Sequence, residues 1–195
     1  LSSIKRSKIV IMAGGLGKRL SPKTNDCPKP MLKVAGKPIL EHIILRAKAE
    51  GFSEFFLSVF YLANVIEEYF GSGERLGVKI NYLRETKPLG TAGALSLLNP
   101  LDKEPIIVTN GDIISNIRYN DLLEFHRENR SFGTMAVRLY EWAHPFGVVK
   151  LNGKRIAGFE EKPVFRSYIN AGMYVLSPVA LQYLTNDKEY DMPQL

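Results

Sequence analysis

The sequence predicts an α/β fold, with a Rossmann-like, mostly parallel sheet flanked by helices. Apolar strand segments alternate with helical segments through the first two thirds of the chain, which is the pattern of a parallel sheet. A glycine-rich loop follows the first strand directly, where such sheets bind ligands. The last third changes to closely spaced strands, so we expect a β-rich extension in the second half.

The first half of the chain supplies three strands and two helices. Strands are predicted at residues 9–13, 54–60 and 78–83, and helices at 39–47 and 64–70. Pro38 suits the first turn of the first helix and Gly51 suits its end. Gly71 and Gly73 stop the second helix.

The second half continues the alternation and then becomes strand-rich. Helices are predicted at residues 91–98 and 119–129 and from Ser177, and strands at 105–109, 132–140, 147–150, 156–160 and 168–176. Asn152-Gly153 is a typical turn between two antiparallel strands. The 195 residues suit one domain with a sizeable core, at residues 8–195, after a polar linker at residues 1–7.

Composition argues against several classes of protein. The net charge of +6 comes from basic residues spread along the chain, so we expect no nucleic-acid partner and a small polyanionic substrate instead. No apolar run approaches the ~20 residues of a membrane span, and no signal peptide is visible. Cys27 is the single cysteine, so an internal disulfide is impossible. We expect a cytoplasmic protein with no membrane partner.

Cysteine and histidine give little sign of catalysis. No motif supplies Cys27 with a histidine or acidic partner, and its place beside Pro28 favours a small loop residue over a nucleophile. The three histidines, at 42, 126 and 144, show no metal-ligand spacing. His42 and His126 fall in helical segments and are interpreted as structural or surface residues.

The stretch from Ile9 to Leu32, IVIMAGGLGKRLSPKTNDCPKPML, carries the strongest functional signal. Its glycines leave backbone N–H groups uncovered, and two cations follow them at once. Lys29 adds a third cation between two prolines. Uncovered N–H groups and clustered cations together predict a cradle for a polyphosphate.

Two common glycine motifs do not fit this stretch. A dinucleotide fingerprint requires glycine where Leu20 stands, which argues against a nicotinamide dehydrogenase. A P-loop requires Ser or Thr at Arg19 and glycine at Met12. The loop therefore belongs to another class of phosphate-binding protein.

Asp112 follows the strand at 105–109 and, with the glycine-rich loop, reaches the same edge of the predicted sheet. An aspartate after Asn110-Gly111 is often only a turn residue. A magnesium–nucleotide site, however, takes only one or two protein carboxylates, because phosphate and water complete the shell. Asp112 is thus either a turn residue or a Mg²⁺ ligand.

The pattern G-G-x-G-x-R-L followed by P-K-P-M resembles the signature loop of the sugar-1-phosphate nucleotidylyltransferases, although Lys18 stands where that family usually has threonine. Further motifs similar to the family's lie at Glu85–Gly93 (ETKPLGTAG), Asn110–Asp112 (NGD), Phe146–Val149 (FGVV), Glu160–Pro163 (EEKP) and Asn170–Gly172 (NAG). They occur in the family's order, and the resemblance runs from Lys8 to about Pro178.

The resemblance implies a role for each matching residue. The implied catalytic residues are Arg19, Lys29 and Lys162, and the implied metal ligand is Asp112, holding Mg²⁺. The implied nucleotide-binding residues are Ala13, Gly14, Gly15, Gly17, Lys18, Glu85, Gly90 and Thr91. The implied sugar-binding residues are Gly147, Glu161, Asn170 and Gly172, which makes the strand-rich second half a sugar-binding extension.

Glu85 bears on the choice of nucleobase. A carboxylate only accepts hydrogen bonds, and guanine offers it two adjacent donors. Uracil and thymine offer one donor between two carbonyls, so guanine is favoured. We expect transfer of a nucleotidyl group from GTP to a sugar 1-phosphate; the sugar is not identified, and UTP or dTTP is the alternative.

A second alternative is a non-catalytic sugar-nucleotide-binding regulatory domain. The family's second metal aspartate lies downstream of these motifs, beyond Leu195, and Asp191 is not assigned its role. We therefore expect residues 8–195 to be truncated at the C-terminus. A homo-oligomer, and a further N-terminal domain in a parent protein, stay open.

Overall fold

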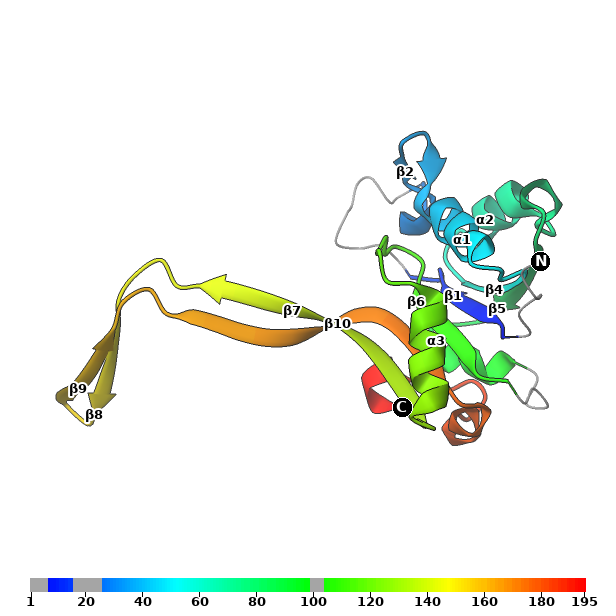
Figure 1. The fold of residues 1–195 in the computed structure, drawn as a ribbon. Helices are drawn as coiled ribbons and strands as arrows, with labels where there is room; N and C mark the ends of the chain where they lie inside the picture. Colours follow the sequence, from blue (N-terminus) through cyan, green and yellow to red (C-terminus); the bar gives the residue numbers. More distant parts are fainter. Residues whose placement is uncertain (1–6, 16–25, 99–103) are drawn as a thin grey trace. The chain divides into compact units, whose positions relative to one another are not determined.

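A computed structural model describes residues 7–15, 26–98 and 104–195 (Figure 1). Its six-stranded sheet has the order β5 (Lys79–Arg84), β4 (Glu54–Val59), β1 (Ile9–Met12), β6 (Ile106–Asn110), β10 (Val164–Leu176) and β7 (Gly133–Ala143). Strands β5, β4, β1 and β6 run parallel, and β10 runs antiparallel to β6. The predicted mostly parallel α/β sheet is confirmed.

In the described part of the chain, the sheet is flanked by the α-helices α1 (Ile39–Ala49), α2 (Ala63–Phe70) and α3 (Tyr119–Glu128) (Figure 1). Pro38 is the N-cap of α1, as its fixed φ favours. The Arg46 guanidinium of α1 donates to the Ile117 carbonyl just before α3, at 2.6 Å. That bond ties the start of α3 to α1. Among the described residues no helix is long and apolar enough to cross a membrane.

Two predicted helices are 3-10 helices instead. The segment predicted as a helix at 91–98 forms η4 (Gly93–Leu97), and the one starting at Ser177 forms η5 (Pro178–Tyr183). Gly93 lies against the C-terminal chain, where an added Cβ would meet the Lys188 carbonyl oxygen at 2.7 Å. Tertiary packing has therefore overridden a helical pattern too short to be stable by itself. Shorter 3-10 turns are η2 (Lys29–Met31), η3 (Glu74–Leu76) and η6 (Met192–Gln194).

The core lies on both faces of the parallel strands. Val10 pairs with Val108, which pairs in turn with Tyr174, and because side chains alternate along a strand these three share one face. They pack against Leu95 of η4 and Met192 of η6 in one apolar cluster. The opposite face of β1 carries Ile9 and Ile11, which are also fully buried.

A buried histidine fixes the start of β7. His126 of α3 is 2% exposed, with Nδ1 2.9 Å from Thr134 Oγ1 and Nε2 3.0 Å from Ser177 Oγ. Burial, with a smaller effect of the Arg127 charge, lowers the pKa of His126. The structural interpretation of His126 is supported, since both ring nitrogens are engaged inside the fold.

The chain divides into two compact units. Unit 1 comprises Leu1–Met135 and Gly172–Leu195, and unit 2 comprises Ala136–Ala171. Unit 1 also holds the two-stranded pair β2 (Lys33–Val34) and β3 (Lys37–Pro38).

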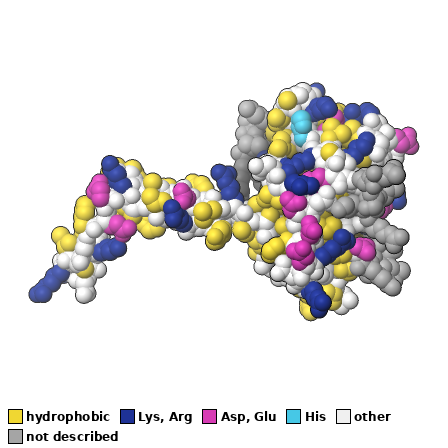
Figure 2. Space-filling model, viewed as in Figure 1, with side chains coloured by type: hydrophobic (Ala, Val, Ile, Leu, Met, Phe, Trp, Pro, Cys, Tyr) yellow, Lys and Arg dark blue, Asp and Glu magenta, His cyan; other side chains and the backbone are white. Residues whose placement is uncertain are grey.

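Unit 2 consists of strand and turn. Its hairpin joins β8 (Val148–Asn152) to β9 (Arg155–Glu160) through Gly153 at φ 59°, which confirms the predicted turn. Ion pairs cross from Lys150 to Glu160 and from Arg166 to Glu141. Its large apolar side chains stay exposed and colour much of its surface yellow in Figure 2.

Candidate functional site

The carboxyl ends of β1 and β6 meet, as the sequence predicts. The Gly111 N–H donates to the Met12 carbonyl at 2.9 Å, so the loop after β6 closes directly on the end of β1. A Cβ at Gly111 would lie 2.9 Å from that carbonyl oxygen and 3.3 Å from Pro30 Cγ. Glycine is needed here because the strand end and the P-K-P turn leave no room for a side chain.

Lys29 and Asp112 form an ion pair across this junction. Lys29 opens η2 between Pro28 and Pro30, and its Nζ contacts Asp112 Oδ2. The two side chains are 39% and 28% exposed, so both remain open to solvent and to a ligand. The structure thus brings a predicted phosphate-binding cation onto the predicted metal ligand.

Asp112 is the carboxylate that meets Lys29 at this junction. Within the described ranges no group of three His, Cys, Asp or Glu side chains is arranged to hold a metal ion. A hard cation such as Mg²⁺ keeps several waters and commonly uses one or two protein carboxylates together with substrate phosphates. Asp112 fits such a shared shell, and a cation bound there would replace the Lys29 ammonium as its partner.

The described part of the glycine loop begins with Ala13, Gly14 and Gly15. The Ala13 N–H donates to the Ser58 carbonyl of β4 at 2.9 Å, so Ala13 continues the sheet. A Cβ at Gly14 would lie 2.8 Å from Glu85 Oε1, whereas one at Gly15 would meet none of the described residues within 4 Å. Packing therefore explains Gly14, while no described residue explains Gly15.

Glu85 holds its own loop together. Its Oε2 accepts a hydrogen bond from the Leu89 N–H at 2.9 Å, and its Oε1 accepts one from Ser58 Oγ. Each carboxylate oxygen can accept a second bond, so contact with a base remains a prediction. Sequence reasoning missed this structural role, and its only sign was a polar Ser58 inside an otherwise apolar strand.

Gly90 and Thr91 lie against the C-terminal chain. Gly90 has φ 73°, and a Cβ there would meet the Tyr190 carbonyl oxygen at 2.4 Å. Thr91 donates both its N–H and its hydroxyl to Asp191 Oδ1, each at 3.1 Å. This contact spans a hundred residues of sequence and was not predicted.

Gly172 lies beside the turn that carries Asp112. It has φ 67°, and a Cβ there would meet Ile113 Cδ1 at 2.4 Å and Asn110 Nδ2 at 2.7 Å. Met173 pairs with Thr109, which places Gly172 at the carboxyl end of β6. A predicted sugar-binding residue and the predicted metal ligand thus flank one loop of unit 1.

The other predicted sugar-binding residues belong to unit 2. A Cβ at Gly147 would lie 2.9 Å from Glu161 Oε2 and 2.4 Å from Phe159 Cζ, so Gly147 and the Glu161 carboxylate are neighbours. Lys162 has φ 45°, a strained value for a non-glycine residue and one that often marks a functional turn. Asn170 is exposed on β10. Arg19, Gly17 and Lys18 lie outside the described residues.

Comparison with known proteins establishes the family. The model of the family described as "Nucleotidyl transferase" matches residues 8–194. The chain therefore belongs to the nucleotidyl transferase family, and its resemblance to the sugar-1-phosphate nucleotidylyltransferases is confirmed. This family generally uses a divalent metal ion.

Several curated relatives are similar over most of this chain. The mannose-1-phosphate guanylyltransferase catalytic subunit beta of Danio rerio is 40% identical over 90% of this chain and 51% of its own length. The UTP–glucose-1-phosphate uridylyltransferase of Synechocystis sp. is 33% identical over 95% of this chain and 53% of its own. The chain thus spans about half the length of the curated relatives it matches.

Among solved structures, HddC from Yersinia pseudotuberculosis complexed with GMP-PN has a similar fold. The TM-score is 0.74 at 26% identity, covering 97% of this chain and 86% of HddC. The fold confirmed above is therefore that of a nucleotidyltransferase.

Proposed function

We propose that this chain carries out, with Mg²⁺, the transfer of a guanylyl group from GTP to a sugar 1-phosphate. The observation that carries the proposal is the junction of β1 and β6, where the Lys29 ammonium meets the Asp112 carboxylate at the end of the strand that leads into the glycine loop. The guanylyltransferase names of relatives, including one from Mycobacterium tuberculosis that is 36% identical, support the choice of base.

The proposed reaction is an in-line displacement. A sugar-phosphate oxygen bonds to the α-phosphorus of GTP, the bond from that phosphorus to the bridging oxygen breaks, and pyrophosphate leaves. The attacking phosphate is already ionised at neutral pH, so no general base is needed. The protein is left to position the reactants and stabilise charge.

Each predicted residue has a part in this scheme. Lys29 and Arg19 neutralise the triphosphate and the departing pyrophosphate, while the backbone from Gly14 to Gly17 cradles it. Asp112 would hold Mg²⁺, and the ion would supply positive charge to stabilise the triphosphate and the departing pyrophosphate. Lys162 binds the sugar phosphate, and Glu161 accepts hydrogen bonds from sugar hydroxyls.

Pyrophosphate release with Mg²⁺, over a grid of GTP, UTP, dTTP and ATP against mannose and glucose 1-phosphates, tests the proposal. We expect release with GTP, and mannose 1-phosphate is the first acceptor to try because of the relatives' names. Release with UTP alone would favour the Synechocystis-like alternative. Tight binding of an NDP-sugar without release would instead indicate a regulatory domain.

We place this reaction in the cytoplasm, with NTP and sugar 1-phosphate as the partners and neither nucleic acid nor membrane. A homo-oligomer and a further N-terminal domain stay predictions. Size-exclusion chromatography with light scattering, on this chain and on any longer parent protein, tests both.

A further inference from the structure

The C-terminal chain from Lys188 to Met192 runs alongside the proposed nucleotide loop, Leu89–Gly93. The Tyr190 N–H donates to the Leu89 carbonyl at 3.0 Å, and the Ala92 N–H donates to the Tyr190 carbonyl at 2.9 Å. These are backbone bonds, so they hold the two segments side by side whatever their side chains. The loop is therefore bordered by chain a hundred residues away in sequence.

The Asp191 side chain adds hydrogen bonds to this pairing of the two backbone segments. Its Oδ1 accepts two hydrogen bonds from Thr91, one from the N–H and one from the hydroxyl, each at 3.1 Å. The same hydroxyl oxygen accepts a bond from the Met192 N–H at 2.8 Å. Both the N–H and the hydroxyl of Thr91 thus donate to the C-terminal turn, and these two bonds fix the loop.

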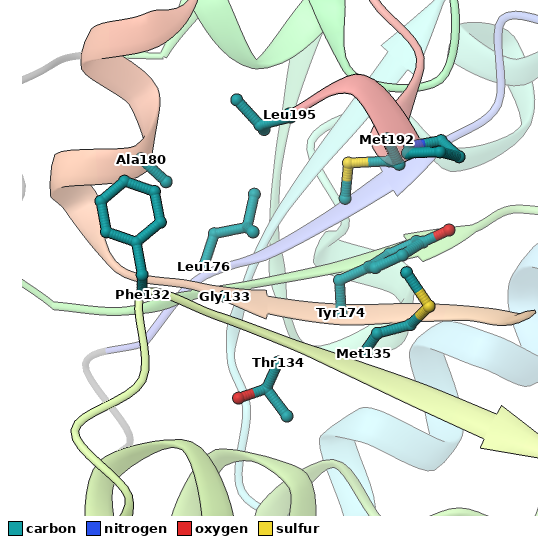
Figure 3. A pocket seen from close by; sticks show the side chains of 10 residues that line it. Phe132, Gly133, Thr134, Met135, Tyr174, Leu176, Ala180, Met192 and Leu195 are labelled. Atoms are coloured by element: carbon teal, nitrogen blue, oxygen red, sulfur yellow. The ribbon is translucent and has the colours of Figure 1, made fainter.

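The turn that carries Asp191 is itself anchored. Asp191 is the N-cap of η6, and its N–H donates to Gln194 Oε1 at 3.0 Å in a capping box. Met192 is 7% exposed and belongs to the core cluster with Val10. Figure 3 shows Met192 and Leu195 at the wall of an apolar cavity of about 260 Å³. A fixed turn therefore holds a loop that contains two glycines.

We propose that Asp191 is a positioning residue for nucleotide binding, acting through Thr91; this rests on the proposed function. Glu85 holds one end of the loop by its bond to the Leu89 N–H, and Asp191 holds the middle. Without Asp191, the glycines at 90 and 93 give the loop more conformations in the free protein. Ordering them again on binding costs affinity, which a pre-organised loop avoids.

The substitution Asp191→Ala removes the acceptor, whereas Asp191→Asn keeps an Oδ1 for both Thr91 bonds. A hydrogen bond to a charged group is worth enough that we expect Asp191→Ala to weaken GTP binding roughly 10-fold. Asp191→Asn should stay within about 2-fold of wild type, because a neutral acceptor retains most of the bond. KM for the sugar 1-phosphate should not change in either variant.

Isothermal titration with GTP and Mg²⁺, steady-state kinetics and amide hydrogen exchange at Thr91 form the test. Glu189→Ala, which removes an exposed carboxylate from the same segment, is the matched control and should behave as wild type. The positioning role is supported if Asp191→Ala shows faster exchange at Thr91 and weaker GTP binding, while Asp191→Asn and Glu189→Ala show neither.

Three results would overturn the inference: unchanged GTP affinity in Asp191→Ala, an Asn variant as weak as the Ala variant, or an equal loss for both substrates with a lower unfolding temperature. Failure of the wild-type chain to bind any nucleotide would reject the proposed function and this inference with it. Failure of the proposed function can be told apart from failure of the Asp191 inference alone, because the former is seen in the wild-type protein and the latter only when the variants are compared with it.

Discussion

The two units differ in how much of themselves they bury. In unit 1, Ile9, Val10 and Ile11 of β1 are fully buried between neighbouring strands and both layers of packing. In unit 2, Ile156 of β9 is 74% exposed, and Ala136 and Pro163 are the only buried residues between 136 and 171. A two-stranded hairpin is at best marginally stable in water, so unit 2 depends on the sheet strands that enter and leave it.

This difference in burial implies that the stability of the fold depends little on the residues proposed to bind the sugar phosphate. The predicted nucleotide and metal residues of unit 1 lie in loops that follow core strands or pack against them, so changes near them risk the fold. Most of the predicted sugar-binding residues sit where little is buried, so they can change at small cost in stability. The predictions below test that separation.

Replacing a large apolar side chain by alanine should destabilise the protein strongly in unit 1 and hardly at all in unit 2. Phe55→Ala removes a fully buried ring from β4 and should cost about 3–5 kcal/mol, a large part of a domain's stability. Ile156→Ala in unit 2 should change it by less than about 0.5 kcal/mol, because the side chain is already in water. Urea denaturation of both variants measures this, and equal losses would remove the contrast.

Loss of the Asp112 carboxylate should abolish most turnover without unfolding the chain. Asp112→Asn leaves the turn intact but takes away the charge proposed to hold Mg²⁺, so pyrophosphate release should fall by about 100-fold or more. The substitution also frees Lys29 from its partner. Near-normal release at saturating Mg²⁺, with the fold confirmed by circular dichroism, would reject Asp112 as the metal ligand.

Gly147→Ala should affect one substrate alone. The added Cβ would meet the end of the Phe159 ring, which is 66% exposed and free to swing away, and the Glu161 carboxylate. We expect KM for the sugar 1-phosphate to rise roughly 10-fold, the loss typical of a displaced charged hydrogen-bonding group. GTP affinity and the unfolding temperature should hold, and weaker GTP binding would show that the units are not separable.

A small pH effect should arise in unit 1 from His126. Burial lowers its pKa in the folded protein, so the unfolded chain binds the proton more readily below its ordinary pKa of about 6.5. The contribution of His126 to stability is thus complete above that pH, and stability should fall as the pH drops towards 5. Unfolding temperatures from pH 7 to pH 5 should fall less steeply for His126→Gln than for wild type; parallel slopes would contradict this account.

Much of the fold was readable from local pattern. The apolar runs at β1, β4 and β6 and the glycine and proline boundaries of α1 and α2 predicted those elements to within a residue or two. The helices predicted at 91–98 and after Ser177 form as the 3-10 helices η4 and η5. The type of helix is decided by packing against residues far away in the sequence, and the local hydrophobic periodicity carries no information about that packing.

The candidate site was predictable only where a motif encodes it. Position along the sheet predicted that the glycine-rich loop and Asp112 would lie at the same sheet edge, but it did not predict the contact between Lys29 and Asp112. The bonds of Glu85 to Ser58 and of Asp191 to Thr91 were not foreseeable, because each joins segments whose distance in space depends on the whole fold. Asp191 alone, in a short polar stretch, offered no spacing or charge pattern to mark it.

The chain leaves unit 1 along β7 and returns along β10, and these strands are neighbours in the sheet. An insertion whose two ends lie side by side can be lengthened, shortened or exchanged without moving its host. Residues 136–171 are therefore a natural segment for exchange between relatives, by which the proposed acceptor site could be altered while the proposed nucleotide site of unit 1 stays as it is.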